Sequence, residues 1–209
     1  LQLLILGKTQ DKQVLPDVSK EANNVSLQGK ASLVSDKTMG TVISLPGAKD
    51  TVKIANADNL DISGDLTLAI WVQFTASTAV NGWLHLVGKG KSGKFNYLLR
   101  VYQQNKEVQF LQSGTKTQLK ASFKNQVFKS KQWYHLAVTS TSQHVKLFVN
   151  GELVGKEAGL AEAATTNQQP VLLGGAGQNV NPKVLIANAT ICSKSFSDYK
   201  VQELYQNDR

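Results

Sequence analysis

Residues 133–156 read WYHLAVTSTSQHVKLFVNGELVGK, and this stretch decides the fold. Apolar side chains occupy every second position in residues 133–139 and again in residues 145–149, which is the period of a pleated strand. The Asn150-Gly151 pair then tolerates the positive φ angles of a type I′ turn, so the chain is expected to return as an antiparallel partner up to residue 156. The stretch therefore predicts an antiparallel β protein.

Turn signals recur about every eight to twelve residues through the rest of the chain, with short alternating segments between them, as in a β-sandwich or barrel. The segments expected to form strands are residues 41–45, 51–54, 66–74, 84–89, 97–102, 108–112, 171–173 and 184–192. One short helix is expected at the end of the chain, where Ser197 can cap it. Val201, Leu204 and Tyr205 would share one face of that helix and dock it on the sandwich.

The composition suits one domain. The chain has 209 residues, 41% of them hydrophobic, a size that all-β sandwiches commonly reach as a single domain, and it shows no linker. We therefore predict one domain over residues 1–209. No apolar run approaches the roughly 20 residues that a membrane helix needs, so insertion into a membrane is not expected. The chain does not begin with Met, and residues 1–6 are too short an apolar run for a signal peptide, so we expect a mature protein or an excised module.

The net charge and the cysteine content limit which ligands and which cellular compartment are expected for this protein. The net charge of +8 comes almost wholly from lysine, because Arg100 and Arg209 are the only arginines. Dispersed lysines are typical of a solvated surface, whereas nucleic-acid sites use more arginine with exposed aromatics, so nucleic acid is not an expected partner and an anionic ligand is favoured. Cys192 is the only cysteine and is expected to be buried, which excludes an internal disulfide and favours a reducing or a bacterial extracellular compartment.

Several motifs in order resemble one family. They are DTVKI at 50–54, LDISGDLTLAIWV at 60–72, WYHLAV at 133–138, LFVNG at 147–151, LLGG at 172–175 and the segment 184–197. As an ordered set they resemble laminin-G-like (concanavalin A-like) jelly-roll domains over nearly the whole chain. The resemblance implies an all-β fold, an antiparallel two-sheet jelly-roll β-sandwich with one short C-terminal helix. It also implies binding of glycans or proteins, often with Ca²⁺, in extracellular or cell-surface molecules, which the cysteine content places in bacteria.

The same resemblance bears on metal binding. The segment DVSKEANN at 17–24 resembles a stretch near the start of related domains, which implies Ca²⁺ ligands at Asp17, Asn23 and Asn24. Related domains often carry an acidic pair after the isoleucine of the late strand, where this chain has Ala187-Asn188. Because that substitution removes two carboxylate ligands, Ca²⁺ is an open alternative, and no other cofactor is expected.

Nucleotide binding and catalysis are not expected. The segment GKGKSGKF at 88–95 satisfies two glycine-rich phosphate motifs, but Phe95 stands where a phosphate loop needs Ser or Thr, and a strand follows in place of a helix. A lysine-bearing hairpin loop is the better interpretation. Glycoside hydrolysis needs a pair of carboxylates, and the acidic residues here occur singly. No nucleophile-elbow pattern supports a serine beside a histidine, and His135 is expected to be a packed core histidine.

One aromatic residue and one strand face offer a binding surface. Trp71 and Trp133 are expected in the core, whereas Trp83 follows Asn81-Gly82 at a junction between loop and strand. Trp83 is the best candidate for stacking against a sugar ring. An equally good interpretation is that this tryptophan closes one end of the sandwich. The residues Asn96, Leu98, Arg100 and Tyr102 are expected to share one face of the next strand. Arg100 could bind a carboxylate or sulfate with two hydrogen bonds, or be buried as a structural partner of an Asp.

The sequence therefore predicts a non-catalytic carbohydrate-recognition module, favouring an anionic polysaccharide, that uses aromatic stacking with amide and guanidinium hydrogen bonds. The loop 174–183 lies at a predicted rim of the sandwich and contributes amides. The predicted ligand-binding residues are Trp83, Asn96, Arg100, Tyr102, Gln178, Asn179 and Asn181. The alternative is a protein-interaction or adhesion module of a larger exported protein, marked by an exposed apolar patch in place of a polar cleft.

Overall fold

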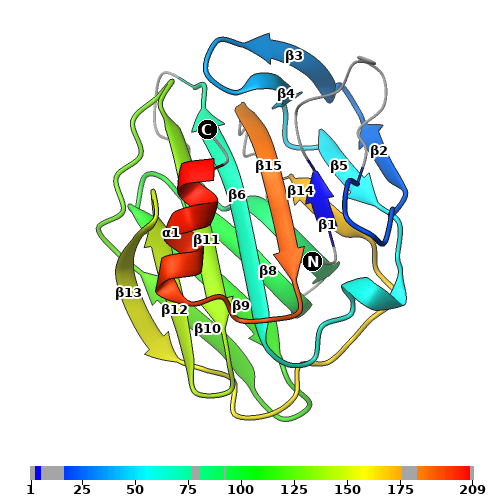
Figure 1. The fold of residues 1–209 in the computed structure, drawn as a ribbon, viewed down its shortest axis with the longest axis vertical. Coiled ribbons are helices and arrows are strands. Elements are labelled where there is room, and N and C mark those ends of the chain that lie inside the picture. Colours follow the sequence, from blue (N-terminus) through cyan, green and yellow to red (C-terminus); the bar gives the residue numbers. More distant parts are fainter. Residues whose placement is uncertain (1–2, 6–16, 77–80, 92, 176–182, 208–209) are drawn as a thin grey trace.

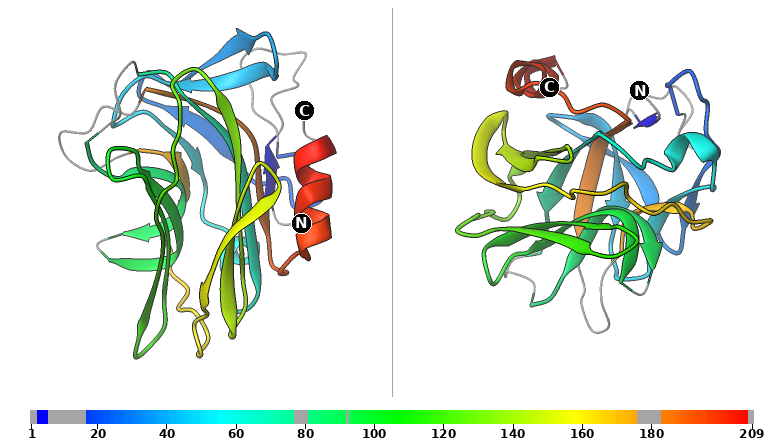
Figure 2. Two further views of the ribbon diagram at one scale, coloured as in Figure 1. Left: turned by 90° about the vertical axis from the view of Figure 1, so that its left-hand side faces the viewer. Right: turned by 90° about the horizontal axis from the view of Figure 1, so that it is seen from below.

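The computed structural model describes residues 3–5, 17–76, 81–91, 93–175 and 183–207. These residues form two antiparallel sheets packed face to face, with one α-helix on the outside (Figures 1 and 2). Sheet A has the strand order β13 (Glu152–Ala158), β12 (His144–Val149), β11 (Trp133–Ser140), β6 (Leu66–Phe74), β15 (Val184–Cys192), β4 (Gly40–Leu45), β3 (Ser32–Asp36), and β1 (Leu3–Ile5) also pairs with β15. Sheet B has the order β10 (Gln118–Phe123), β9 (Glu107–Ser113), β8 (Lys94–Tyr102), β7 (Leu84–Lys91), β14 (Val171–Gly174), β5 (Thr51–Ile54), β2 (Val25–Gln28).

Strands that are neighbours within a sheet often come from distant parts of the chain. For example, β6 lies between β11 and β15, and β14 lies between β7 and β5. The chain therefore crosses repeatedly from one sheet to the other, which is the jelly-roll topology that the sequence predicted. A 3-10 turn, η1 (Asp58–Leu60), connects β5 to β6.

The hairpin of β12 and β13 forms at the predicted turn. Asn150 has φ 52° and Gly151 has φ 80°, the left-handed values that a type I′ turn requires. Val149 pairs with Glu152 directly across this turn. The strand predictions at β5, β6 and β15 agree with the structure to the residue. Four described strands were not predicted, namely β1, β2, β3 and β10.

The hydrophobic core lies between the two sheets. Tyr97, Leu99 and Val101 point inward from β8 and are fully buried, as are Leu136 and Val138 from β11. Burying an aliphatic side chain of this size contributes about 1.5–3 kcal/mol, so the two alternating faces hold the sandwich closed. The side chains of sheet B that alternate outward from this core are left to form a surface.

The helix α1 (Asp198–Asn207) covers the outer face of sheet A, as the left view of Figure 2 shows. It begins as predicted, because the hydroxyl oxygen of Ser197 accepts a hydrogen bond of 3.2 Å from the backbone amide of Lys200. Val201 is fully buried in a cluster with Ala69, Ala137 and Phe148 of the sheet. In the part of the chain that the structure describes, no helix is long and apolar enough to cross a membrane.

Predictions for single core residues had mixed outcomes. Trp71 and Cys192 are buried as expected. Trp133 is only partly buried, and its indole nitrogen donates a hydrogen bond of 3.2 Å to the carboxylate of Asp36 at the edge of sheet A.

Lys89 also differs from the sequence-based interpretation of a lysine-bearing loop. The glycine-rich segment does form the hairpin between β7 and β8, but Lys89 has an exposure of 0%. Its ammonium group lies 3.2 Å from the carboxylate of Asp61 and donates hydrogen bonds of 2.8 and 2.7 Å to the backbone oxygens of Asn167 and Gln169. This lysine therefore fixes the segment before β14 against sheet B.

Candidate ligand-binding site

Three of the predicted site residues meet on the outer face of sheet B, on the side of the molecule opposite α1 (Figure 2). The guanidinium carbon of Arg100 lies 4.0 Å from the ring centre of Trp83. The ring of Tyr102 stands edge-on to Trp83, with 5.3 Å between the centroids and 68° between the planes. We call these three residues the aromatic–arginine cluster. All three side chains are half-buried, so each keeps part of its surface open.

The local sequence explains why Trp83 lies there. Gly82 has φ 138°, a conformation that side chains disfavour, and it turns the chain from the loop into β7. Leu84 then pairs with Val101, which places Trp83 beside Tyr102 on the neighbouring strand. The hydroxyl group of Tyr102 donates a hydrogen bond to the side-chain oxygen of Asn81, which ties the loop to β8.

A chain of hydrogen bonds holds the guanidinium group of Arg100 in place. Its Nε and one Nη2 hydrogen donate bonds of 3.0 and 2.6 Å to the side-chain oxygen of Gln109. The amide nitrogen of Gln109 donates in turn to Glu107 at 2.7 Å and to Ser122 at 2.9 Å. Since a guanidinium group has five N–H donors, the remaining ones on Arg100 are free to bind an anion. Arg100 is thus paired with a Gln and not with the Asp that the structural alternative had suggested.

Burial lowers the pKa of Arg100, and the charge of Glu107 acts in the opposite direction. Arginine remains protonated at neutral pH despite such a shift, because its ordinary pKa exceeds 12. The cluster therefore presents a fixed positive charge beside two aromatic rings. Cation–π contact with Trp83 orients this charge further.

A groove continues from the cluster along the outer face of sheet B. His85 pairs with Arg100 across the strands and forms one wall, together with Phe95 and Leu98. The groove has a volume of about 210 Å³. The residues lining it are Ala48, Thr51, His85, Gly88, Gly90, Phe95, Leu98, Leu172, Gly174 and Gly175.

Glycine keeps this groove open. A Cβ atom added at Gly88 would lie 2.8 Å from the Cδ1 atom of Leu98, so any side chain there would enter the space that the groove occupies. Burial, and then the charge of Arg100, lower the pKa of His85 below its ordinary value of 6.5. His85 is consequently neutral at pH 7 and can donate one hydrogen bond and accept another.

Asn96 does not belong to this surface, which corrects the sequence prediction. It has an exposure of 0%, and its amide group bonds the backbone of Ile62 and Thr165 at 2.9–3.0 Å. The cause is a β-bulge: Tyr97 pairs with Lys89 and Phe95 pairs with Gly90, so Asn96 has no residue opposite it. The extra residue reverses the alternation of faces, which turns Asn96 inward and brings Phe95 to the groove.

Gln178, Asn179 and Asn181 fall outside the described residues. The missed residues His85 and Phe95 become visible only through the bulge and the strand pairing. A sequence signal did exist at Gly88, since glycine within a strand often marks a close approach or an open site.

The predicted Ca²⁺ ligands form a small hydrogen-bonded turn. One carboxylate oxygen of Asp17 accepts from the backbone amide of Ser19 at 2.9 Å, and the other accepts from the backbone and side-chain amides of Asn23 at 2.8 and 2.7 Å. The backbone oxygen of Asn24 accepts from the amide of Ala55 at 2.9 Å. Among the described residues, no three His, Cys, Asp or Glu side chains gather as metal ligands would. The carboxylate of Asp17 serves to shape the turn.

The groove on sheet B is lined by few ionisable side chains. The described residues that line it include one titratable side chain, His85, and no carboxylate. The acid and base pair that glycoside hydrolysis requires is therefore not found among them.

Comparison with known proteins agrees with the fold. A model of the concanavalin A-like lectin/glucanases superfamily matches residues 46–202. No curated protein matches the sequence.

Among solved structures, the receptor binding domain of botulinum neurotoxin C/D mosaic serotype aligns with a TM-score of 0.78 at 17% identity, over 98% of this chain and 50% of that one. The binding domain of botulinum neurotoxin DC in complex with rat synaptotagmin II has a TM-score of 0.78 at 12% identity, over 99% and 51%. The botulinum neurotoxin serotype D ligand binding domain in complex with N-acetylneuraminic acid has a TM-score of 0.78 at 16% identity, over 98% and 50%. The chain spans about half the length of these structures, and at such identities the likeness concerns the fold.

Proposed function

The chain belongs to the concanavalin A-like lectin/glucanases superfamily, and from this premise we propose that residues 1–209 form a single, non-catalytic carbohydrate-recognition module. Its ligand is a glycan that carries a carboxylate or sulfate group. The observation that carries the proposal is the guanidinium group of Arg100, which lies between Trp83 and the groove with donors to spare.

The proposed binding mode follows from the chemistry of this face. The anionic group of the glycan receives charge-assisted hydrogen bonds from Arg100, which are about twice as strong as neutral ones. The adjoining sugar ring packs against the open edges of Trp83 and Tyr102, and the next part of the chain lies in the groove beside His85. Sugar hydroxyls can both donate to and accept from the neutral imidazole of His85.

The related structures support the same class of function. One neighbour is a ligand binding domain in complex with N-acetylneuraminic acid, which is a sugar with a carboxylate. Because this chain matches only half of that structure, the proposal for this chain depends on its own residues. We also propose that the module acts outside the cell, as binding domains of this kind do.

A protein partner is the alternative. One neighbour is in complex with rat synaptotagmin II, and in this chain Leu153 and Val154 are exposed on β13, the edge strand of sheet A. An exposed edge strand can pair with an extended segment of another protein. This alternative would use sheet A, whereas the glycan proposal uses sheet B, so variants on the two sheets separate them.

A glycan array that includes neutral, carboxylated and sulfated glycans tests the proposal. Wild-type protein should bind anionic glycans saturably, and Trp83→Ala and Gly88→Val should each remove that binding. Gly88→Val fills the groove with a residue that suits a strand, so the fold should persist, as circular dichroism can verify. Trp133→Ala is the matched control, because it removes a half-buried tryptophan from the other sheet.

Adding EDTA tests the Ca²⁺ alternative on the same array. Unchanged binding in EDTA would mean that Asp17 and Asn23 act only in their turn. Absence of binding to every glycan, combined with capture of a protein partner that is lost in Leu153→Glu, would replace the glycan proposal with the alternative.

A further inference from the structure

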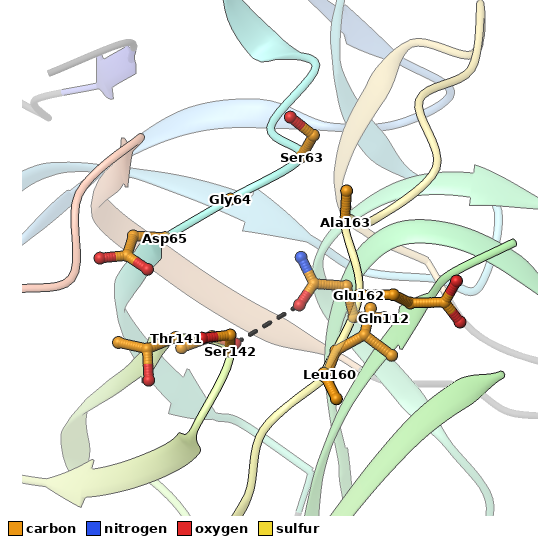
Figure 3. Close-up of a pocket in the computed structure, with 11 residues that line it drawn as sticks. Ser63, Gly64, Asp65, Gln112, Thr141, Ser142, Leu160, Glu162 and Ala163 are labelled. Carbon is orange, nitrogen blue, oxygen red and sulfur yellow. Dashed lines mark hydrogen bonds between the residues drawn. The ribbon is translucent and has the colours of Figure 1, made fainter.

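A second hollow lies at one open end of the sandwich, between the edges of the two sheets (Figure 3). It has a volume of about 340 Å³, within the range of about 300–1,000 Å³ that is typical of small-molecule sites. Its walls are the segment that enters β6, the turn between β11 and β12, and the connection between β13 and β14. It shares no lining residue with the groove on sheet B.

The side chain of Gln112 forms the inner wall of this hollow and has an exposure of only 2%. Its oxygen accepts a hydrogen bond of 3.4 Å from the hydroxyl group of Ser140. Its amide nitrogen has no partner among the described residues, and Figure 3 shows this nitrogen turned into the open space of the hollow. Leaving a buried donor unpaired is unfavourable, so a partner from outside the chain is expected to occupy the hollow.

The wall opposite Gln112 supplies complementary groups. Asp65 is exposed at the mouth, and its carboxylate forms no hydrogen bond or ion pair with the described residues. The hydroxyl groups of Ser63 and Ser142 can each donate or accept, and Leu160 adds an apolar contact. An occupant therefore needs an acceptor for Gln112, donors for Asp65, and several further hydroxyl-type groups close together.

The charge of the hollow disfavours an anionic occupant. Glu162 also lines it, but Figure 3 shows the carboxylate pointing away, and it accepts hydrogen bonds of 2.7 and 2.8 Å from the hydroxyl and amide groups of Thr117. The hydroxyl groups of Thr115 and Thr117 lower the pKa of Glu162 to about 2, so it is ionised at neutral pH. With Asp65 this makes two negative charges, and the described lining contains no Lys or Arg to balance them.

We propose that this end of the sandwich is a second binding site, for a neutral, hydroxyl-rich ligand of the size of one hexose ring. A hexose fits because its adjacent hydroxyls act as donors and acceptors at once, which meets the demands of Gln112 and Asp65 together. The site differs in charge from the groove on sheet B, so the two select different sugars. The module would hold a neutral sugar unit at its end and an anionic one on its face.

The test uses ¹⁵N-labelled protein titrated with glucose, galactose, N-acetylglucosamine and glucuronate, followed by NMR. The neutral sugars should shift the side-chain amide signal of Gln112 and the backbone amides of residues 63–65 and 140–142 in a saturable manner. Glucuronate should bind at least about tenfold more weakly, because its carboxylate is repelled by the carboxylate of Asp65. Asp65→Asn should weaken neutral-sugar binding about three- to tenfold, because Asn keeps an acceptor oxygen and loses only the charge that strengthens the hydrogen bond.

Two further variants separate this site from its alternatives. Gln112→Leu should abolish the sugar-dependent shifts of residues 63–65 and 140–142 and change the melting temperature little, since it removes an unpaired donor but also the acceptor of Ser140. Trp83→Ala should leave these shifts unchanged, which distinguishes failure of this proposal from failure at the groove. Glu162→Gln, whose side chain points away, should change the sugar affinity less than about twofold. If no neutral sugar moves the Gln112 signal, or if Asp65→Asn and Gln112→Leu both bind as wild type does, a bound water satisfies the amide and the proposal is wrong.

Discussion

The outer faces of the two sheets carry the same three kinds of side chain, but only one face is covered. Each face has a Trp, a His and a Tyr, which are Trp71, His135 and Tyr205 on sheet A, and Trp83, His85 and Tyr102 on sheet B. On sheet A the helix α1 supplies the tyrosine and covers the tryptophan and the histidine. On sheet B a strand supplies it, and Arg100 lies where the other face has a helix.

The geometry of the covered set shows what the helix does. The rings of Trp71 and Tyr205 stack with 5.5 Å between centroids and 21° between planes, and His135 lies 5.3 Å from Trp71. His135 is fully buried, and neither ring nitrogen has a hydrogen-bond partner among the described residues. Residue type alone therefore does not distinguish a packing cluster from an open surface, because the difference depends on whether another element covers it.

The largest expected effect comes from removing the cover. Val201→Asp places a carboxylate against Ala69, Ala137 and Phe148, which should lower the free energy of unfolding by about 3–5 kcal/mol. Urea denaturation measures this. Tyr199→Asp is the matched control, since Tyr199 is 75% exposed on the same helix and should change stability by less than about 0.5 kcal/mol. Equal effects from the two variants would mean that α1 does not stabilise sheet A.

The second prediction concerns pH and His135. Burial lowers the pKa of His135 from 6.5 to about 4, so the folded protein favours the neutral ring and the unfolded chain takes up the proton first. The contribution of His135 to stability is therefore fully present above about pH 7, and it is lost as the pH drops from 6.5 toward 4. Each unit of difference in pKa corresponds to about 1.4 kcal/mol, so the loss approaches about 3 kcal/mol by pH 4 and is about 2 kcal/mol at pH 5.

Thermal or urea unfolding between pH 7.5 and pH 5 measures the His135 effect. His135→Phe keeps an aromatic ring against Trp71 but cannot titrate, so most of this pH dependence should vanish in the variant. A variant that keeps the full slope would assign the slope to another group.

The third prediction concerns the uncovered face. Arg100→Ala should weaken binding of a sulfated glycan about 10- to 100-fold, the size expected for hydrogen bonds to a charged group. Arg100→Lys keeps the charge but loses the fork that bonds Gln109, so it should recover only part of the affinity. Titration calorimetry gives both values. Stability should change little in either variant, because Arg100 is half-exposed, and a large loss of stability would make Arg100 a structural residue like His135.

The sequence predicted the covered face better than the uncovered one. Val201, Leu204 and Tyr205 recur at helical spacing after a capping serine, and that periodicity survives in the structure. The inward-facing residues of β8 were predicted equally well, because Tyr97, Leu99 and Val101 alternate without interruption. Both signals depend on local spacing alone. Strands such as β10 were missed because they lie at a sheet edge and mix apolar with exposed polar residues.

The proposed binding surface depends on information that spacing does not carry. The sequence singled out Arg100, Trp83 and Tyr102, which the structure brings together, because an isolated arginine and a tryptophan after Asn-Gly are unusual in themselves. Asn96 was misplaced because one bulged residue reverses every face assignment beyond it. The partnership of His85 with Arg100 required the pairing of β7 with β8, which no short pattern specifies.

The smallest expected effect uses His85, the counterpart of His135 on the open face. Burial and the neighbouring Arg100 lower the pKa of His85, so it is neutral at pH 7 and gains a proton as the pH falls. A bound sulfate stays ionised and favours that proton, hence affinity for a sulfated glycan should rise about two- to fourfold between pH 7 and pH 5.5. His85→Gln should bind with no such slope. Affinity that instead falls on acidification would show that the hydrogen bonds of the neutral imidazole to sugar hydroxyls outweigh any attraction of its charged form to the anionic group, and that group would then lie on the Trp83 side of Arg100, away from the groove.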